Sequence, residues 1–285
     1  MRVRSLPVFG PHGFRKLAYT EWGSPDNPRV VVCVHGLTRT GRDFDALAEA
    51  LVGAPAGGWR VVCPDVAGRG QSEWLPSPQY YDFPLYMADM AALIARLDVP
   101  ELTWIGTSMG GLIGMFLASQ PNTPIRRLLL NDIGPFLPAA ALAVIRDRLA
   151  PETLFPDLAG LETHLRLTLA EFGALTDDQW RHLAVTSARV AEDGTSLRLH
   201  YDPAIATRMR AGELADVDLW PVWDNLRCPM LVLRGENSQV LPAEVAAQMQ
   251  RRAVACRVET IAGCGHAPAL MDAAQIDLVR SWLGP

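Results

Sequence analysis

The chain has 285 residues, of which 49% are hydrophobic, and a formal net charge of −5 at pH 7. This length suits one large domain, or a domain with an insertion, and leaves ample chain for a hydrophobic core. The mildly acidic balance excludes the broad basic surface that nucleic-acid binding requires.

Short aliphatic runs alternate with helix-like segments in the first half of the chain. The runs are continuous and unpatterned, which is typical of strands buried on both faces of a parallel sheet. They lie at residues 30–34, 60–64, 102–106 and 126–130. Apolar residues recur at helical spacing between them, at 43–51, 87–97 and 111–120. The repeated strand–helix order predicts an α/β fold with right-handed crossovers.

The pattern changes after Pro135, and residues 136–222 are expected to be helical without a clear strand. Helical patterns lie at 139–149, 161–172 and 177–190, with an extended connector expected at 197–203. Thr176 and Gln179 form a capping-box pair at the start of the third helix.

Strand patterns return at 228–235 and 256–263, with helical patterns at 243–252 and 274–283. The chain is therefore predicted to form a core of residues 1–135 and 223–285. A helical block of residues 136–222 would be inserted into that core.

Residues 106–110 read Gly-Thr-Ser-Met-Gly, a G-x-S-x-G pentad between a predicted strand and a predicted helix. A strand that enters a helix here must turn tightly, and small neighbours permit the strained backbone that exposes the hydroxyl of Ser108. Ser108 is thus a candidate nucleophile. The alternative is an ordinary glycine-rich strand-to-helix loop.

Two histidines follow predicted strands. His35 precedes a loop that begins at Leu37, whose backbone N–H is expected to bind an oxyanion together with the N–H of Met109. His35 itself is interpreted as a scaffold residue. His266, in the segment GCGHAP, comes last in the order serine, acid, histidine of one hydrolase architecture and is the candidate base.

With the segment PDVAGRGQS at 64–72, these motifs resemble the α/β-hydrolase superfamily along essentially the whole chain. The resemblance implies an eight-stranded, mostly parallel sheet flanked by helices, with the block at 136–222 as a helical cap. Serine at position 108 argues against the epoxide hydrolases and haloalkane dehalogenases of this superfamily, which use aspartate there. Acyl chemistry remains, along with carbon–carbon bond hydrolysis.

The acid that partners the histidine is not where this family usually has it. Close relatives often carry an aspartate at the position of Gln239, and glutamine supplies no charge. In the family fold the sixth strand neighbours the fifth, so Asp132, after the sixth strand, is expected on the same sheet edge as Ser108 and is the predicted acid, with Glu236 as the alternative. A loop-shaping role is the other interpretation of Asp132. The pattern resembles small bacterial serine carboxylesterases with the acid after strand six and a serine at the strand-seven position. The resemblance implies that Ser238 is a catalytic residue that either bridges Asp132 and His266 or supports Asp132.

The expected function is hydrolysis of small carboxylic esters through an acyl-enzyme, with no cofactor and no metal site. The alternatives are a carbon–carbon hydrolase of a vinylogous diketone and a receptor-type member with weak or no hydrolysis. Apolar cap residues are expected to favour an apolar acyl or alcohol group, or else to form cap core; they are Phe136, Leu137, Phe155, Phe172 and Trp180.

The remaining expectations concern partners and location. The small-molecule ester is the expected partner, with no nucleic acid and no membrane, and the protein is expected to be a monomer or homodimer. The start of the sequence lacks the apolar stretch of a signal peptide, and no apolar run is long enough to span a bilayer. The five cysteines show no metal-ligand or redox spacing. A cytoplasmic protein is therefore expected.

Overall fold

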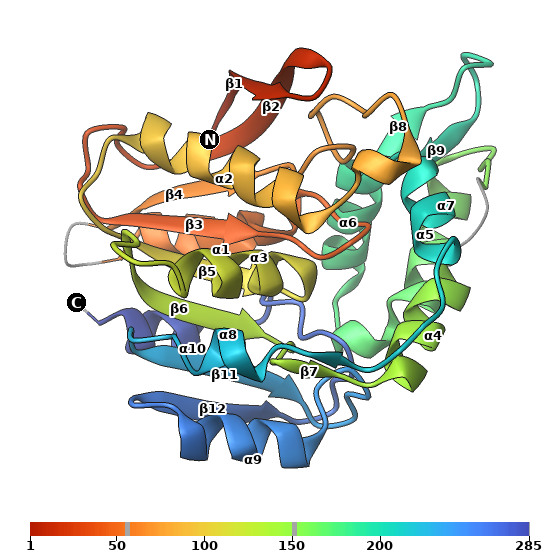
Figure 1. Ribbon diagram of the computed structural model, residues 1–285. Coiled ribbons are helices and arrows are strands. Elements are labelled where there is room, and N and C mark those ends of the chain that lie inside the picture. The colour runs from red at the N-terminus through yellow and green to blue at the C-terminus, as the bar shows by residue number, and fades with distance from the viewer. Residues whose placement is uncertain (55–57, 150–152, 285) are drawn as a thin grey trace.

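A twisted eight-stranded sheet with the strand order β1-β2-β4-β3-β5-β6-β11-β12 forms the middle of the molecule, and helices cover both of its faces (Figure 1). The computed structural model describes residues 1–54, 58–149 and 153–284. Strand β2 pairs antiparallel with β1 and β4, and the other neighbours pair in parallel. The predicted fold class is confirmed.

The central strands match the aliphatic runs of the sequence. The sheet comprises β1 (Arg2–Gly10), β2 (Gly13–Trp22), β3 (Val30–Val34), β4 (Arg60–Pro64), β5 (Leu102–Thr107), β6 (Ile125–Asn131), β11 (Met230–Gly235) and β12 (Cys256–Ile261). All five residues of β3 are buried, because they alternate between two separate hydrophobic clusters, one on each face of the sheet. This is why the run shows no polar alternation.

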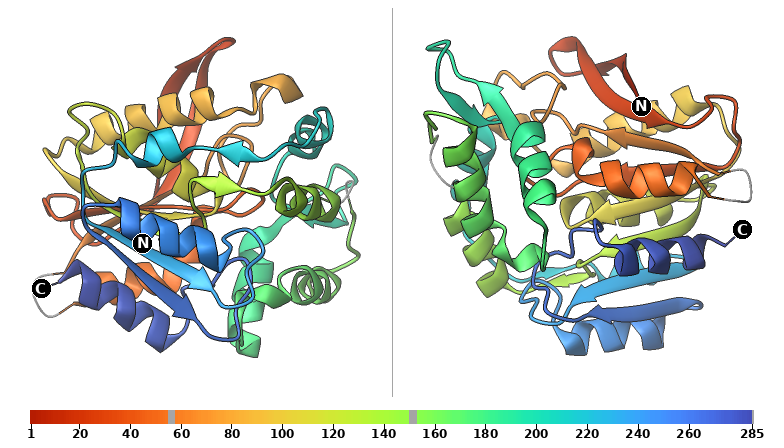
Figure 2. Two further views of the ribbon diagram at one scale, coloured as in Figure 1. Left: turned by 60° about the horizontal axis from the view of Figure 1, so that its bottom comes forward. Right: turned by 180° about the vertical axis from the view of Figure 1, so that it is seen from behind.

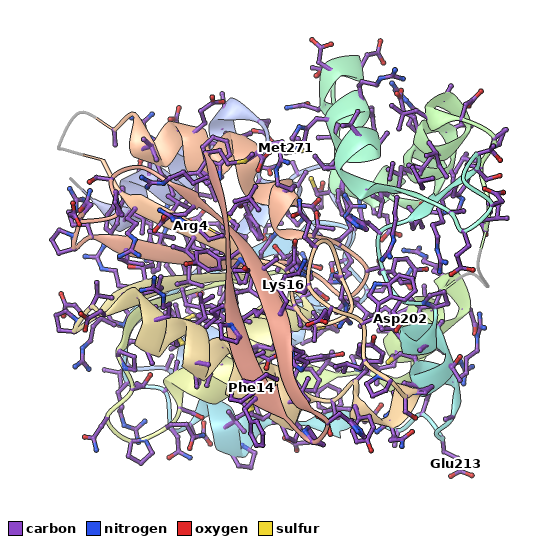
Figure 3. All side chains as sticks on the ribbon, turned by 90° about the horizontal axis from the view of Figure 1, so that it is seen from above. Arg4, Phe14, Lys16, Asp202, Glu213 and Met271 are labelled. Carbon is purple, nitrogen blue, oxygen red and sulfur yellow. The ribbon has the colours of Figure 1, made fainter. Side chains whose placement is uncertain are left out.

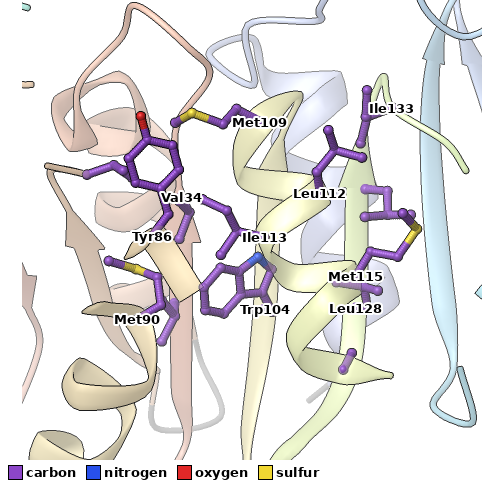
Figure 4. Close-up of a cluster of buried hydrophobic side chains, with 14 of the residues drawn as sticks. Val34, Tyr86, Met90, Trp104, Met109, Leu112, Ile113, Met115, Leu128 and Ile133 are labelled. Atoms are coloured by element: carbon purple, nitrogen blue, oxygen red, sulfur yellow. The ribbon is translucent and has the colours of Figure 1, made fainter. Parts of the chain in front are cut away.

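Helices α1 (Asp45–Val52) and α10 (Ala273–Leu283) cover one face of the sheet (Figure 2). The other face carries α2 (Phe83–Leu97), α3 (Met109–Ala118), α8 (Trp220–Trp223) and α9 (Ala243–Arg252). Figure 4 shows the centre of that second layer, where Trp104 of β5 packs against Ile113 and lies near Met90. These buried contacts hold α3 in place, and with it Ser108, the residue that precedes the helix.

Most of the chain between β6 and β11 lies beside the carboxyl ends of the parallel strands, and α8 at its end returns to the face of the sheet (Figures 1 and 2). Its elements are β7 (Phe136–Leu137), α4 (Ala139–Arg148), α5 (Leu158–Thr168), the 3-10 helix η3 (Ala170–Phe172), α6 (Asp177–Ser187), β8 (Ala188–Val190), β9 (Leu197–Leu199), α7 (Ala204–Arg210), β10 (Val217–Asp218) and α8. Thr176 and Gln179 form the predicted capping box at the start of α6. The cap boundaries at 136 and 222 stay a prediction.

The expectation that residues 136–222 contain no clear strand is wrong. β7 pairs with β10, and β8 pairs with β9, in two small antiparallel ladders. Each of these strands has two or three residues. A period of two cannot show itself over so few positions, and the partners of β7 and β10 are distant in sequence.

The hairpin of β1 and β2 crosses the molecule when it is seen from above, with Arg4, Phe14 and Lys16 along it (Figure 3). Two further 3-10 helices, η1 (Gly41–Phe44) and η2 (Pro78–Tyr80), precede α1 and α2. Within the described ranges, none of the helices combines the length and the apolar character that a membrane crossing needs.

Candidate active site

Ser108 occupies the turn between β5 and α3 with φ 50° and ψ −115°. A side chain rarely adopts this positive φ, and the two glycines of the pentad make room for it. A Cβ at Gly106 would lie 2.3 Å from the carbonyl oxygen of Gly110, and one at Gly110 would lie 2.0 Å from the carbonyl oxygen of Val34. The tight turn therefore requires both glycines.

Substituting Gly110 by alanine is expected to lower the free energy of unfolding by about 1–3 kcal/mol, because the β3 backbone cannot move away from the added methyl group. Urea denaturation measures this loss. Gly212→Ala is the matched control, since a Cβ there meets no atom within 4 Å. Equal stability of the two variants would contradict the packing argument.

His266 lies in the loop after β12 and connects two other side chains. Its Nε2 is 2.9 Å from Oγ of Ser108, and its Nδ1 is 2.7 Å from Oδ2 of Asp132. These three residues come from the carboxyl ends of β5, β6 and β12, where a parallel sheet gathers its loops. A nucleophile, a base and an acid in this hydrogen-bonded order suit nucleophilic catalysis.

Asp132 is fully buried, and three donors face its carboxyl group. The N–H of Gly235 donates to Oδ1 at 2.8 Å, and the hydroxyl of Ser238 donates to Oδ2 at 2.5 Å, beside His266. Ser238 must donate here, since its oxygen already accepts the N–H groups of Val240 and Leu241. Ser238 thus supports the carboxyl group and makes no hydrogen bond with the imidazole.

Glu236 and Gln239, the two positions in the β11 loop considered for the acid, do not join this group. Glu236 is exposed and accepts the N–H of Gly263 at 2.9 Å. Gln239, at the position where the family often has aspartate, is also exposed. The carboxylate that contacts the imidazole ring of His266 comes from the end of β6.

His35 is a scaffold residue in the loop after β3. Its Nδ1–H donates to the carbonyl of Gly36 at 2.7 Å, and its Nε2 accepts the N–H of Val66 at 2.9 Å. Burial lowers the pKa of His35 to about 3, so the ring is neutral. It fixes the course of the loop that carries Leu37.

Arg69 lies fully buried beneath the same loop and connects it to the start of α3. Its Nε–H donates to the carbonyl of Leu37 at 2.8 Å, and Nη2 lies 3.6 Å from the sulfur of Met109. Nη1 donates to the carbonyl of Ala67 and the hydroxyl of Tyr86. Figure 4 shows the Met109 side chain reaching toward Tyr86. These partners include no carboxylate, so Arg69 places a buried positive charge beside the loop of Leu37.

A pocket opens above Ser108, with about 960 Å³ of empty space including its mouth. The core contributes Gly36, Leu37, Thr38, Arg39, Thr107, Ser108, His266 and Ala267. The segment after β6 contributes Ile145, Arg148, Leu149, His164, Leu165, Thr168, Leu169, Phe172, Leu199 and Tyr201. The roof is mostly apolar.

Of the apolar cap residues singled out in the sequence, Phe172 lines the pocket. Phe155 and Trp180 are buried in a cluster of their own with Phe172, between the cap helices. Leu137 belongs to the main core, and Phe136 is partly buried. Most of these side chains therefore belong to hydrophobic clusters and do not line the pocket.

The η3 segment holds the loop of His266. The carbonyl of Glu171 accepts the N–H of Gly265 at 2.8 Å, and its Oε2 accepts the N–H of His266 at 3.2 Å. Arg148 pairs with the same carboxylate at 2.8 and 3.1 Å. A Cβ at Gly265 would lie 2.9 Å from Glu171, so glycine permits this close approach.

Comparison with known proteins places this architecture in a family. The family model for the alpha/beta hydrolase fold matches residues 29–273, most of the chain. The chain belongs to the α/β-hydrolase family. It is a hydrolase of that fold type, as the order of the motifs predicted.

This α/β hydrolase is 45% identical to the 3-hydroxybutyrate-oligomer hydrolase of Cupriavidus necator, over 96% of this chain and 95% of the relative. A crystal structure of a protein from Rickettsia typhi described as a hydrolase superposes with a TM-score of 0.91, with 34% identity and 99% of each chain covered. An α/β hydrolase from Novosphingobium aromaticivorans gives a TM-score of 0.86 with 32% identity, over 99% of this chain and 97% of that one.

Sequence reasoning missed Arg69 and the pair of Arg148 and Glu171. Arg69 stands inside the quoted segment 64–72, so a signal existed, but a charged residue in a loop suggests the surface before its burial is known. Glu171 contacts residues that follow it by more than ninety positions, and no local pattern in the sequence of this hydrolase predicts such a contact.

Proposed function

We propose that the protein is a serine esterase that cleaves short carboxylic esters through an acyl-enzyme, with oligomers of a hydroxy acid such as 3-hydroxybutyrate as its substrates. The observation that carries the proposal is the hydrogen-bonded order Ser108, His266, Asp132 on the floor of a mostly apolar pocket. The 45% identical relative, named for the hydrolysis of ester-linked oligomers, supports the substrate class.

The reaction begins with the attack of Ser108, assisted by removal of its proton. Asp132 accepts the Nδ1–H of His266, which leaves Nε2 as the acceptor that faces Ser108 at 2.9 Å. Nε2 takes the hydroxyl proton as Oγ attacks the ester carbonyl carbon. The carboxylate then stabilises the imidazolium. The Ser238 hydroxyl and the Gly235 N–H hold that carboxylate in place.

The negative charge develops on the carbonyl oxygen. We assign its stabilisation to the N–H groups of Leu37 and Met109, since Leu37 lines the pocket and Met109 begins α3, where helical N–H groups have no partner within the helix. Arg69 braces both residues from below. The alcohol then leaves with the proton from His266, and water repeats the sequence to release the acid.

The test is turnover of p-nitrophenyl butyrate and of the 3-hydroxybutyrate dimer by wild type and Ser108→Ala. Wild type is expected to cleave both, with an initial burst that marks the acyl-enzyme. Ser108→Ala is expected to lose about 10⁶-fold in kcat. A fluorophosphonate that labels Ser108 in wild type reports the nucleophile directly. Equal rates in the two proteins would overturn the serine mechanism.

A further inference from the structure

Arg148, at the end of α4, is the exposed cation of the pocket. Its side chain is 48% exposed, whereas that of Arg39, the other guanidinium in the lining, is 7% exposed. Arg39 also donates through Nε and Nη2 to both oxygens of Asp43, at 2.8 and 2.7 Å. Of the two guanidinium groups, Arg148 is therefore the more accessible to an anionic ligand group.

The hydrogen bonds of Arg148 leave one side of the guanidinium open. Nη1 and Nη2 donate to Glu171, at 3.1 and 2.8 Å, and so use the end-on edge of the group. Within the described ranges, the side-on edge of Nε and Nη has no acceptor. A guanidinium presents five donors in a fixed fork and can take one carboxylate on each of these edges.

Glu171 also links Arg148 to the loop of the catalytic histidine. Its carboxylate accepts both the guanidinium of Arg148 and the backbone N–H of His266, whose ring contacts Ser108. Arg148 is thus a single side chain away from the catalytic histidine. In an oligomer of a hydroxy acid, one hydroxyacid unit separates the last ester carbonyl from the free carboxylate, so the two groups that Ser108 and Arg148 would bind belong to neighbouring parts of the substrate.

We propose that Arg148 forms a carboxylate subsite that selects esters whose leaving alcohol carries a free carboxylate, so that the enzyme removes hydroxy acids from the carboxyl end of an oligomer. The inference rests on the proposed esterase function. Ser108 attacks the last ester carbonyl, the bond from that carbon to the alcohol oxygen breaks, and the alcohol oxygen takes its proton from His266. The hydroxy acid leaves with its carboxylate at Arg148, and the shortened chain stays on Ser108 until water releases it.

The pair with Glu171 has two consequences for this subsite. It fixes the guanidinium before substrate arrives, so less side-chain entropy is lost on binding. Hydrogen bonds from Arg148 lower the pKa of Glu171, which stays ionised and limits the affinity for a second carboxylate. The subsite therefore favours the free acid by a moderate factor.

The experiment compares kcat/KM for the 3-hydroxybutyrate dimer and for its methyl ester, which lacks the terminal charge. Wild type is expected to prefer the free acid about ten- to hundredfold, as a charge-assisted pair would give. Arg148→Gln is expected to bring the ratio near one. The ratio compares kcat/KM for two substrates of the same protein. A loss of catalytic rate that Arg148→Gln causes at His266 through Glu171 affects both substrates and therefore cancels in the ratio. Arg146→Gln, on the same helix and outside the pocket lining, is the control that keeps the preference.

A trimer labelled in its carboxyl-terminal unit is expected to release the label first as monomer. The subsite is overturned if Arg148→Gln keeps the wild-type ratio. It is also overturned if wild type has the same kcat/KM for the methyl ester and for the free acid. Both results leave ester hydrolysis standing. Failure of wild type on every ester, p-nitrophenyl butyrate included, would instead overturn the proposed function.

Discussion

Replacing Asp132 by asparagine is expected to lower kcat for p-nitrophenyl butyrate by about 10⁴-fold, as loss of the acid does in triads of this kind. The N–H of Gly235 donates to Oδ1, so an asparagine here turns its carbonyl oxygen toward Gly235. Its NH₂ group then faces Nδ1 of His266. A donor at that point forces Nδ1 to accept and places the ring proton on Nε2, where it blocks removal of the Ser108 proton.

The matched control is Glu236→Gln, which tests the alternative acid of the same active-site edge. Its carboxylate is exposed and accepts the N–H of Gly263, so we expect activity within about twofold of wild type. Thermal unfolding of both variants shows whether they keep the fold. A folded Asp132→Asn with near wild-type kcat would make Asp132 structural and return Glu236 as the candidate acid.

The sequence was informative wherever chemistry follows the end of a strand. Ser108, Asp132 and His266 each come directly after an aliphatic run or a short loop beyond it, and parallel strands bring those ends to one edge. Their order along the chain, together with glutamine at position 239 where the family often has aspartate, was enough to propose Asp132 as the partner of His266. The contacts depend on topology, which repeated strand–helix units determine strongly.

The contacts missed by sequence reasoning depend on how distant loops meet. Glu171 reaches the loop of His266 because η3 packs against Gly265, and Arg148 reaches Glu171 from another helix. Local sequence patterns do not predict contacts between such distant residues. The short strands after β6 were hard to predict for another reason, since each has two or three residues, too few to show a period of two. Of these segments, only that of β9 lay in an expected extended connector.

Arg69 marks the second position where a large effect is expected. Arg69→Met is expected to reduce kcat by about 10²–10³-fold with KM nearly unchanged, since the N–H groups it braces act on the transition state. The carbonyl of Leu37 would lose its donor, and the Met109 side chain would lose its neighbour. A buried positive charge beside the developing oxyanion would also be lost. Affinity for a trifluoromethyl ketone, which forms an oxyanion on Ser108, should fall in parallel with kcat.

A purely structural role for Arg69 gives a different outcome, and two further variants separate the two roles. Tyr86→Phe removes one hydrogen bond of the same guanidinium away from Leu37, so kcat is expected within about fivefold of wild type. Arg69→Lys keeps the charge and is expected to lie between wild type and Arg69→Met. Titration of Ser108 with a fluorophosphonate counts the folded sites. If kcat per titrated site and ketone affinity stay at wild-type values while stability falls, Arg69 stabilises the fold alone. If both fall together, the buried charge and its brace belong to the catalytic apparatus.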